Sequence, residues 1–288
     1  MKIFVTGSEG FVGRNLISQC EKKGIEIIGI DSVASSKPNF YQGDVRSKKI
    51  IEVIPQNADA VVHLAALSRD GDCQKRVYDC FDMNVMGTLN LLEAAKKKNV
   101  KQFIFASSEW VYGDSKSEEL KDENSIIDPR KLTSAYALSK LVSEQNLRQE
   151  HERDFCPVTI LRFGIIYGPR KANWSAVESL FHAVKSKDTI EVGSLKTARR
   201  FIHVTDIGKG IIASLGHKGF EIFNLGGNEL ITLKDIIETS LNLLGKKPKI
   251  VQSNPGETSI RNISNAKIKK ALGWQPEISL KIGLKTLL

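Results

Sequence analysis

The N-terminal segment up to Asp31 contains the pattern that most restricts the fold of this chain. Residues 2–6 form a short apolar run, "TGSEGFVGRNLISQCEKKG" follows with the spacing GxxGxxG, and a second apolar run at residues 25–30 ends in the acid Asp31. Glycines let a backbone turn tightly and approach a diphosphate, whose charge then meets the N-terminus of the following helix. This strand, turn, helix and strand predict a parallel sheet with helices packed on it.

The same segment predicts a dinucleotide site. A carboxylate at the end of the second strand can accept hydrogen bonds from both ribose hydroxyls, and it would repel a 2′-phosphate. We therefore expect Asp31 to select NAD rather than NADP. A glycine triplet by itself leaves open an ordinary turn without a ligand. The expected cofactor contacts in the turn and at the start of the helix are Gly7, Gly10, Phe11, Val12 and Gly13.

The pattern of strands and helices continues along the chain. Further strands are expected at residues 39–44, 58–64, 103–107 and 158–163, with a polar loop from 65 to 81. Strands that alternate with helices predict an α/β fold with a Rossmann-type, doubly wound parallel sheet. We expect an NAD-binding domain at residues 1–164, with 200–215 packing back on it. Residues 165–288 would form a smaller C-terminal α/β lobe for the substrate.

Composition excludes several classes of protein. The net charge is +9, but the lysines lie in small clusters near the ends of expected helices, where cations suit the helix dipole. A solvated surface is the plain interpretation, and a basic field that attracts an anionic substrate is the alternative. No motif supports nucleic-acid binding. The four cysteines form no CxxC pair, which favours a reduced, cytoplasmic protein without a metal site. No apolar run approaches the roughly 20 residues of a membrane helix.

A second chemical motif lies in "SAYALSKLVSEQNL", where Tyr136 and Lys140 stand four residues apart. On a helix these positions share a face. An ammonium near a phenol favours the phenolate, so we expect Lys140 to lower the pKa of Tyr136. Such a tyrosine can take or give a proton at an alcohol carbon. The spacing alone would also fit an exposed pair on a helix.

Taken together, the motifs resemble those of the extended short-chain dehydrogenase/reductase superfamily, in its nucleotide-sugar epimerase/dehydratase branch. The resemblance extends over nearly the whole chain. It rests on TGSEGFVG, GDV, HLAA, NVMGTLNLLEAA, SSEWVYG, YALSK, LRFGIIYGPR, RRFIHVTDI and LGWQP.

The resemblance implies roles for particular residues. Tyr136 would be the general base and acid, Lys140 would bind the nicotinamide ribose and tune Tyr136, and Ser108 would hydrogen-bond the reacting sugar oxygen. Arg199 and Arg261 would contact the diphosphate of a nucleotide-diphosphate sugar, most simply a UDP-sugar. A homodimer would form through the helices at 84–97 and 136–150. Further NAD contacts are implied at Asp44, Val45, Leu64, Ala65 and Ala66.

The residue before "VYG" departs from part of the family. Sugar dehydratases and decarboxylases typically have a proton-removing glutamate there, whereas this chain has Trp110 and places its acid one position earlier, at Glu109. Successive residues of an extended segment point to opposite sides, so the shift argues against dehydratase and decarboxylase chemistry. Glu109 is a candidate ligand of a substrate hydroxyl. A carboxylate satisfied by backbone amides and an acid/base role are the alternatives.

Two more departures concern the substrate phosphates. Ile165 occupies the place of a usual asparagine, and Arg200 that of a common aspartate. Arg200 would compensate beside Arg199 or bind an acidic sugar such as a uronate. The predicted function is an NAD-dependent, UDP-glucose 4-epimerase-like enzyme that oxidises its nucleotide sugar transiently to a keto-sugar. The alternatives are an NAD(P)-dependent reductase or dehydrogenase, or a dehydratase, acting on a nucleotide sugar. A redox-sensing NAD-binding regulator is disfavoured by the Tyr136–Lys140 pair.

Overall fold

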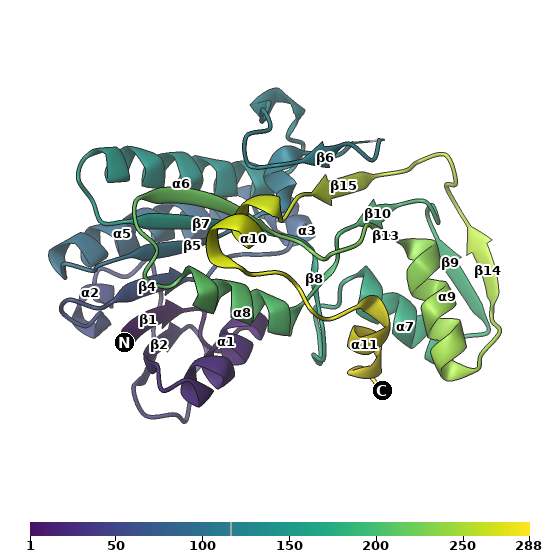
Figure 1. Cartoon of the computed structure of the whole chain (residues 1–288), viewed down its shortest axis with the longest axis horizontal. Helices are drawn as coiled ribbons and strands as arrows, with labels where there is room; N and C mark the ends of the chain where they lie inside the picture. The colour runs from purple at the N-terminus through teal and green to yellow at the C-terminus, as the bar shows by residue number, and fades with distance from the viewer. Residues whose placement is uncertain (116) are drawn as a thin grey trace. The chain divides into compact units, whose positions relative to one another are not determined.

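A computed structural model describes residues 1–115 and 117–288 of the chain (Figure 1). The chain divides into two compact units, each formed by three segments. The predicted division at residue 164 differs from this one in two respects, because 114–125 belongs to the second unit and the segment returning to the first unit is 208–223. The first unit consists of Met1–Gly113, Ile126–Arg162 and Gly208–Phe223, and the second of Asp114–Ser125, Phe163–Ile207 and Asn224–Leu288.

The main sheet of the described residues has seven strands in the order β12-β7-β5-β4-β1-β2-β3. The pairs β1–β2, β1–β4, β2–β3 and β4–β5 are all parallel. The predicted doubly wound α/β fold is therefore confirmed. The strands are β1 (Lys2–Thr6), β2 (Glu26–Asp31), β3 (Phe40–Gln42), β4 (Ala60–His63), β5 (Phe103–Ser108), β7 (Val158–Phe163) and β12 (Phe220–Leu225).

Apolar side chains bury both faces of this sheet. Phe4, Val61 and Phe103 belong to a core shared with the helices α2, α5 and α6. Their neighbours along the strands, such as Ile3 and Ile104, point to the opposite face and are also buried. Burial on both faces explains why the strands are continuous apolar runs. The helical segments are α1 (Phe11–Lys22), α2 (Ile50–Val53), α3 (Asp70–Lys75), α4 (Val77–Phe81), the π-helix η1 (Asp82–Met86), α5 (Gly87–Lys97), the 3₁₀ turns η2 (Glu109–Tyr112) and η3 (Pro129–Lys131), and α6 (Ala135–Glu152).

The expected loop at residues 65–81 is wrong from Asp70 onward. That stretch contains α3 and α4, which lead through η1 directly into α5. Cys73 and Cys80 are the buried residues of the two short helices. Helices of six and five residues contain too few apolar positions to show a period of 3.6, so the pattern resembles a polar loop.

The second unit has a small four-stranded sheet in the order β13-β10-β15-β6 and the parallel pairs β8–β11 and β9–β14. The helix that begins at Leu233 has a defined start and end: Thr232 and Asp235 form a capping box, and Gly245, with φ 62°, follows its last residue. The strands are β6 (Leu120–Lys121), β8 (Ile166–Tyr167), β9 (Thr189–Val192), β10 (Ala198–Arg199), β11 (Ile202–His203), β13 (Ile231–Thr232), β14 (Lys249–Gln252) and β15 (Ile260–Ile263). The helices are α7 (Ala176–Ser186), α9 (Leu233–Leu244), α10 (Ala266–Leu272) and α11 (Leu280–Lys285), and α8 (Val204–Ser214) contains residues of both units.

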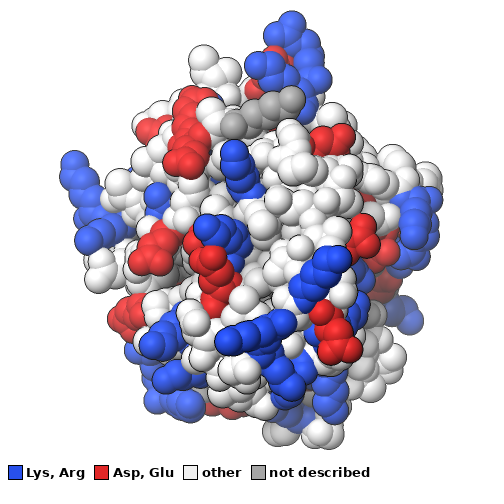
Figure 2. Space-filling model, turned by 90° about the vertical axis from the view of Figure 1, so that its right-hand side faces the viewer, with Lys and Arg blue, Asp and Glu red and all other residues white. Residues whose placement is uncertain are grey.

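Charged side chains are mixed on the surface. Figure 2 shows basic and acidic residues interspersed over the face that it presents, without one large area of a single sign. No helix within residues 1–115 and 117–288 is long and apolar enough to cross a bilayer.

A chain of hydrogen bonds joins the ends of β1 and β4 to α5. The Ala65 amide donates to Thr6 Oγ1 (3.2 Å), which lies 2.7 Å from His63 Nδ1, and His63 Nε2 lies 3.0 Å from Thr88 Oγ1. Thr88 Oγ1 in turn donates to the Asn84 carbonyl at 2.6 Å. Since Thr88 uses its only proton there, His63 Nε2 must donate, and in the neutral ring Nδ1 then accepts from Thr6 Oγ1. A neutral His63 therefore satisfies both of its ring nitrogens.

We expect this histidine to make stability depend on pH. Burial, with the charge of Lys140 acting in the same direction, lowers the His63 pKa from 6.5 to about 3. The unfolded chain takes up the proton first, so the stabilisation is complete above pH 6.5 and is lost as pH falls towards 3. In His63→Gln, which keeps one donor and one acceptor, the pH slope of the unfolding free energy should fall by up to about 1.4 kcal/mol per unit. Urea unfolding between these pH values measures it, and equal slopes would contradict this assignment.

Candidate active site

The glycine turn after β1 leaves no space for side chains. A Cβ on Gly13 would lie 2.2 Å from the Gly7 carbonyl oxygen, and one on Gly7, whose φ is 70°, would lie 2.8 Å from the Ala65 amide nitrogen. Gly10 precedes α1 and provides no side-chain cap, and the half-buried Phe11 and Val12 begin the helix. The bare turn and the uncapped start of α1 fit the diphosphate of a dinucleotide.

Asp31 is held by the same turn. Its Oδ2 accepts from the Glu9 amide (2.9 Å), and its Oδ1 accepts from the Val33 amide (3.0 Å) and Ser32 Oγ (3.3 Å). A carboxylate has about four acceptor positions, and three are used here, so a further hydrogen bond from a ribose hydroxyl can be added. The position at the end of β2 agrees with the ribose contact expected from the sequence.

The other expected cofactor residues lie in two loops at the same edge of the sheet. Leu64 and Ala65 pack against Gly7, and Ala66 follows them in the chain. Val45 is buried, and its carbonyl accepts from Asn90 of α5 at 2.7 Å. Asp44 binds Arg46 through both carboxylate oxygens, and these hydrogen bonds lower the Asp44 pKa.

The structure brings Ser108, Tyr136 and Lys140 together. Ser108 ends β5, and its Oγ accepts from the Trp110 amide at 3.3 Å, which leaves its proton for a hydrogen bond to Tyr136. Lys140 is buried, and its ammonium donates to the Ala106 carbonyl at 2.7 Å and lies 5.9 Å from the centre of the Tyr136 ring. A hydroxyl donor, a phenol and an ammonium therefore lie where β5 meets α6.

The expected lowering of the tyrosine pKa by Lys140 is wrong for this structure. Burial raises the pKa of Tyr136 to about 12, and the Ser108 hydrogen bond opposes this rise. Burial also lowers the pKa of Lys140 to about 8. Desolvation disfavours the charged form of each group and is the largest cause of both shifts. The ammonium is directed at a backbone carbonyl instead of the phenol.

The segment after Ser108 is not extended. Glu109 and Trp110 therefore need not point to opposite sides, as the sequence argument on the shifted acid assumed. Glu109–Tyr112 is a 3₁₀ turn. Trp110 lies beside the catalytic candidate, with its ring edge-on to Tyr136 at 6.4 Å between centroids. Glu109 has no exposed surface in this structure. This burial gives no support to its expected contact with a substrate hydroxyl.

Several residues that sequence reasoning did not single out support these groups. Asn84 of η1 binds the backbone of Leu67 through both side-chain atoms, at 2.8 and 3.1 Å, and donates to Ser139 Oγ of α6 at 3.0 Å. Asn84 thus ties the loop after β4 to the helix that carries Tyr136. A polar residue at the start of an apolar helix was the only signal of it in the sequence.

In the second unit, Arg199 and Arg261 are direct neighbours. They are register partners on β10 and β15, and both contact Asp114 Oδ1, at 3.5 and 2.8 Å. Arg199 also donates to the carbonyls of Ala198 and Ser259. Two guanidinium groups therefore lie side by side at one carboxylate.

The two departures at the phosphate positions have structural explanations. Arg200 donates to Asn262 Oδ1 (2.6 Å) and to the carbonyls of Gly227 and Asn228. Its guanidinium is thus largely occupied by the protein, which gives no support to a contact with a uronate. Ile165 packs against the apolar core of the second unit.

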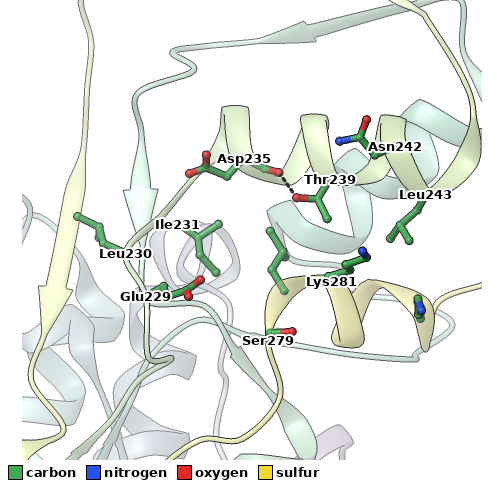
Figure 3. A pocket seen from close by; sticks show the side chains of 11 residues that line it. Glu229, Leu230, Ile231, Asp235, Thr239, Asn242, Leu243, Ser279 and Lys281 are labelled. Atoms are coloured by element: carbon green, nitrogen blue, oxygen red, sulfur yellow. Dashed lines mark hydrogen bonds between the residues drawn. The ribbon is translucent and has the colours of Figure 1, made fainter.

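A cavity of about 890 Å³ lies elsewhere in the second unit, between α9, α11 and the segment before β13 (Figure 3). Asp235, Thr239 and Lys281 are among its lining residues. None of the predicted site residues lines this cavity, so we assign it no role in the chemistry. Within residues 1–115 and 117–288 there is no group of three acidic, histidine or cysteine residues arranged to hold a metal.

Comparison with known proteins shows the family of this chain. Residues 3–226 match the NAD dependent epimerase/dehydratase family. A "Putative UDP-glucose 4-epimerase" of Methanocaldococcus jannaschii is 31% identical, with 98% of this chain and 96% of that protein covered. A UDP-glucuronate 4-epimerase of Thermodesulfobacterium geofontis is 29% identical, with 98% and 93% covered. The structure of a UDP-glucose 4-epimerase of Bifidobacterium longum in complex with NAD⁺ and UDP has a TM-score of 0.87 at 25% identity, with 99% and 96% covered. The predicted resemblance is confirmed.

The glycine turn provides a test of the cofactor site. In Gly13→Ala the new methyl would lie 2.2 Å from the Gly7 carbonyl and 2.7 Å from that of Ser8. Overpacking of this kind costs roughly 1–3 kcal/mol, which corresponds to about a 5- to 150-fold change in an equilibrium constant. We expect weaker NAD binding, measured by calorimetry. Gly71→Ala, where a Cβ meets nothing within 4 Å, is the control. Equal affinities for the two variants would contradict the assignment of the turn.

Proposed function

We propose that this chain, which belongs to the NAD dependent epimerase/dehydratase family, is a UDP-sugar 4-epimerase. The single observation that carries the proposal is the arrangement of Ser108, Tyr136 and Lys140 beside the indole of Trp110. An indole cannot remove a proton from carbon. The Trp110 side chain beside Tyr136 therefore favours epimerisation of the sugar over dehydration or decarboxylation. The relatives named as UDP-glucose and UDP-glucuronate 4-epimerases support this choice.

The residues of this chain would move one proton. NAD, when bound by the glycine turn and Asp31, supplies the acceptor and donor of hydride together with a positive charge that favours a phenolate. Tyr136 takes the proton of the sugar hydroxyl as that carbon is oxidised, and Ser108 holds the same oxygen. The keto-sugar then rotates in the site, so that its opposite face points toward the nicotinamide. Tyr136 returns the proton to the same oxygen as the carbon is reduced on its other face.

Burial and the Ser108 hydrogen bond act in opposite directions on the charge of the phenol. With a pKa of about 12, Tyr136 would be almost fully protonated at neutral pH. The hydrogen bond from Ser108 opposes this, and Lys140, with a pKa of about 8, carries a positive charge at pH 7. The strength of Tyr136 as the base that removes the proton of the sugar hydroxyl would thus depend on hydrogen bonding and nearby charge.

The substrate anchor would be the arginine pair of the second unit. Arg199 and Arg261 share Asp114, and planar guanidinium groups suit phosphate oxygens. The two negative charges of a diphosphate would compete with Asp114 for these guanidinium groups. This supports the contact that the family resemblance implied.

A homodimer is part of the proposal. Apolar side chains of α4, η1 and α6 are exposed: Val77 50%, Tyr78 81%, Met86 56% and Leu138 36%. These elements contact one another within the first unit. Met86 and Leu138 lie in the segments 84–97 and 136–150 that were expected to form the interface, whereas α4 lies just before the first of them. A second copy would bury these side chains. We also propose a cytoplasmic location, which the four free cysteines favour.

The proposed chemistry requires Tyr136. We expect Tyr136→Phe to lower kcat by at least about 10²-fold, because general acid–base catalysis contributes that much or more. The assay follows interconversion of UDP-glucose and UDP-galactose, and of UDP-glucuronate and UDP-galacturonate. Tyr41→Phe, which alters a half-exposed phenol on β3, is the control. Near-normal turnover in Tyr136→Phe would refute the proposal. Continuous net formation of NADH would instead favour a dehydrogenase.

The dimer is tested at the exposed face of α6. Leu138→Glu should shift the protein from dimer to monomer, because a charge would be buried without a partner. Light scattering during size-exclusion chromatography measures the mass. Ile126→Glu alters an apolar residue that is 92% exposed and should leave the mass unchanged. A wild-type monomer at all concentrations would contradict the dimer.

A further inference from the structure

The helix that carries Tyr136 and Lys140 carries a further polar side chain in line with them. Glu144 follows Lys140 by four residues, so it extends the same face of α6 by one turn. Its side chain has no exposed surface. A buried carboxylate is strongly unfavourable unless it is paired and hydrogen-bonded, so the partners of Glu144 define what it does.

Arg162 of β7 is the ionic partner. Its Nε donates to Glu144 Oε1 at 3.0 Å and its Nη2 donates to Oε2 at 2.6 Å, which makes a two-point contact. The Arg162 side chain is only 3% exposed. Two parallel hydrogen bonds between a guanidinium and a carboxylate are the arrangement that best compensates the burial of two charges.

Each member of the pair also binds a residue close to Ser108 in the sequence. Ser107 Oγ donates to Glu144 Oε1 at 2.5 Å. Arg162 Nη1 donates to the Tyr112 hydroxyl at 2.9 Å, and the guanidinium carbon lies 4.9 Å from the centre of the Tyr112 ring. Ser107 immediately precedes Ser108, and Tyr112 is the last residue of η2. The pair therefore holds the chain on both sides of the serine.

We propose that Glu144 and Arg162 are positioning residues that set the distance between Ser108 Oγ and the Tyr136 hydroxyl. This inference rests on the proposed function, because that hydrogen bond matters for a reaction in which Tyr136 exchanges a proton. The fixed points are the Ala106 carbonyl on Lys140, Ser107 on Glu144 and Tyr112 on Arg162. Loosening the last two lets the Ser108 segment move away from α6.

Two variants loosen the segment to different degrees. Tyr112→Phe removes one hydrogen bond and keeps the ring on the guanidinium. Arg162→Lys keeps the charge but loses the two-point contact and the link to Tyr112. We expect kcat to fall on the order of 10- to 100-fold in Arg162→Lys, and less in Tyr112→Phe, because small displacements of reacting groups have effects of this size. KM for the UDP-sugar should change little.

The pKa of Tyr136 provides a readout that a merely structural role would not move. The Ser108 hydrogen bond lowers this pKa, so displacement of Ser108 should raise it. Ultraviolet difference titration of the NAD-bound protein against Tyr136→Phe isolates this one phenol. Arg170→Lys is the matched control, because Arg170 Nε lies 2.7 Å from the buried Glu178 in the second unit. It should affect stability without shifting the Tyr136 pKa.

A double-mutant cycle decides whether the effect passes through Ser108. Ser108→Ala should raise the Tyr136 pKa, and adding Arg162→Lys to Ser108→Ala should raise it no further. Additive shifts, or an unchanged Tyr136 pKa in both Arg162→Lys and Tyr112→Phe, would overturn the inference. If the wild type converts no UDP-sugar, the proposed function fails. A non-additive pKa shift in that case would still support the positioning of Ser108.

Discussion

The parallel register of β2, β1, β4 and β5 is the constraint on which the first unit depends. Thr6 pairs with both Ile30 and His63, and His63 pairs with Phe105. The carboxyl ends of these strands therefore lie at one edge, with the glycine turn, Asp31, the loop after His63 and Ser108 beside one another along it. Ligands of open α/β sheets bind at this edge. A slip of one residue would turn every side chain to the opposite face of the sheet.

Burial governs the charges at this edge more strongly than proximity does. The pKa of Tyr136 is raised and the pKa values of Lys140 and His63 are lowered, so each shift favours the neutral form of the group. Desolvation is the largest cause in each case. Glu144 and Arg162 remain an ion pair because each carboxylate oxygen meets a guanidinium nitrogen. Helical spacing predicts that Tyr136 and Lys140 share a face, but it says nothing about where the ammonium is directed. Reasoning from spacing alone therefore gave the wrong sign for the Tyr136 pKa.

The sequence predicted well what repeats locally and poorly what depends on contacts between distant segments. The strands of the main sheet, the glycine turn and the caps at Thr232 and Gly245 follow from short patterns, and the structure contains them. The short helices α3 and α4 were missed because they show no usable period. The pairing of Glu144 with Arg162 joins a helix to a strand 18 residues away. The pairing of Arg261 with Asp114 joins segments much farther apart, and no local pattern indicates it.

The tyrosine helix shows why these long-range contacts matter for chemistry. Tyr136, Lys140 and Glu144 follow one another at intervals of four residues on α6. Each binds one of three adjacent residues of β5, through the Ser108 hydroxyl, the Ala106 carbonyl and the Ser107 hydroxyl respectively. A helix and a strand joined at three points can move relative to each other only if several hydrogen bonds break together. Glu144 could not serve as the third point without Arg162, because burial of an unpaired carboxylate is strongly unfavourable. The ion pair between Glu144 and Arg162 thus lets one face of α6 carry Tyr136 together with the two residues, Lys140 and Glu144, that fix the helix to β5.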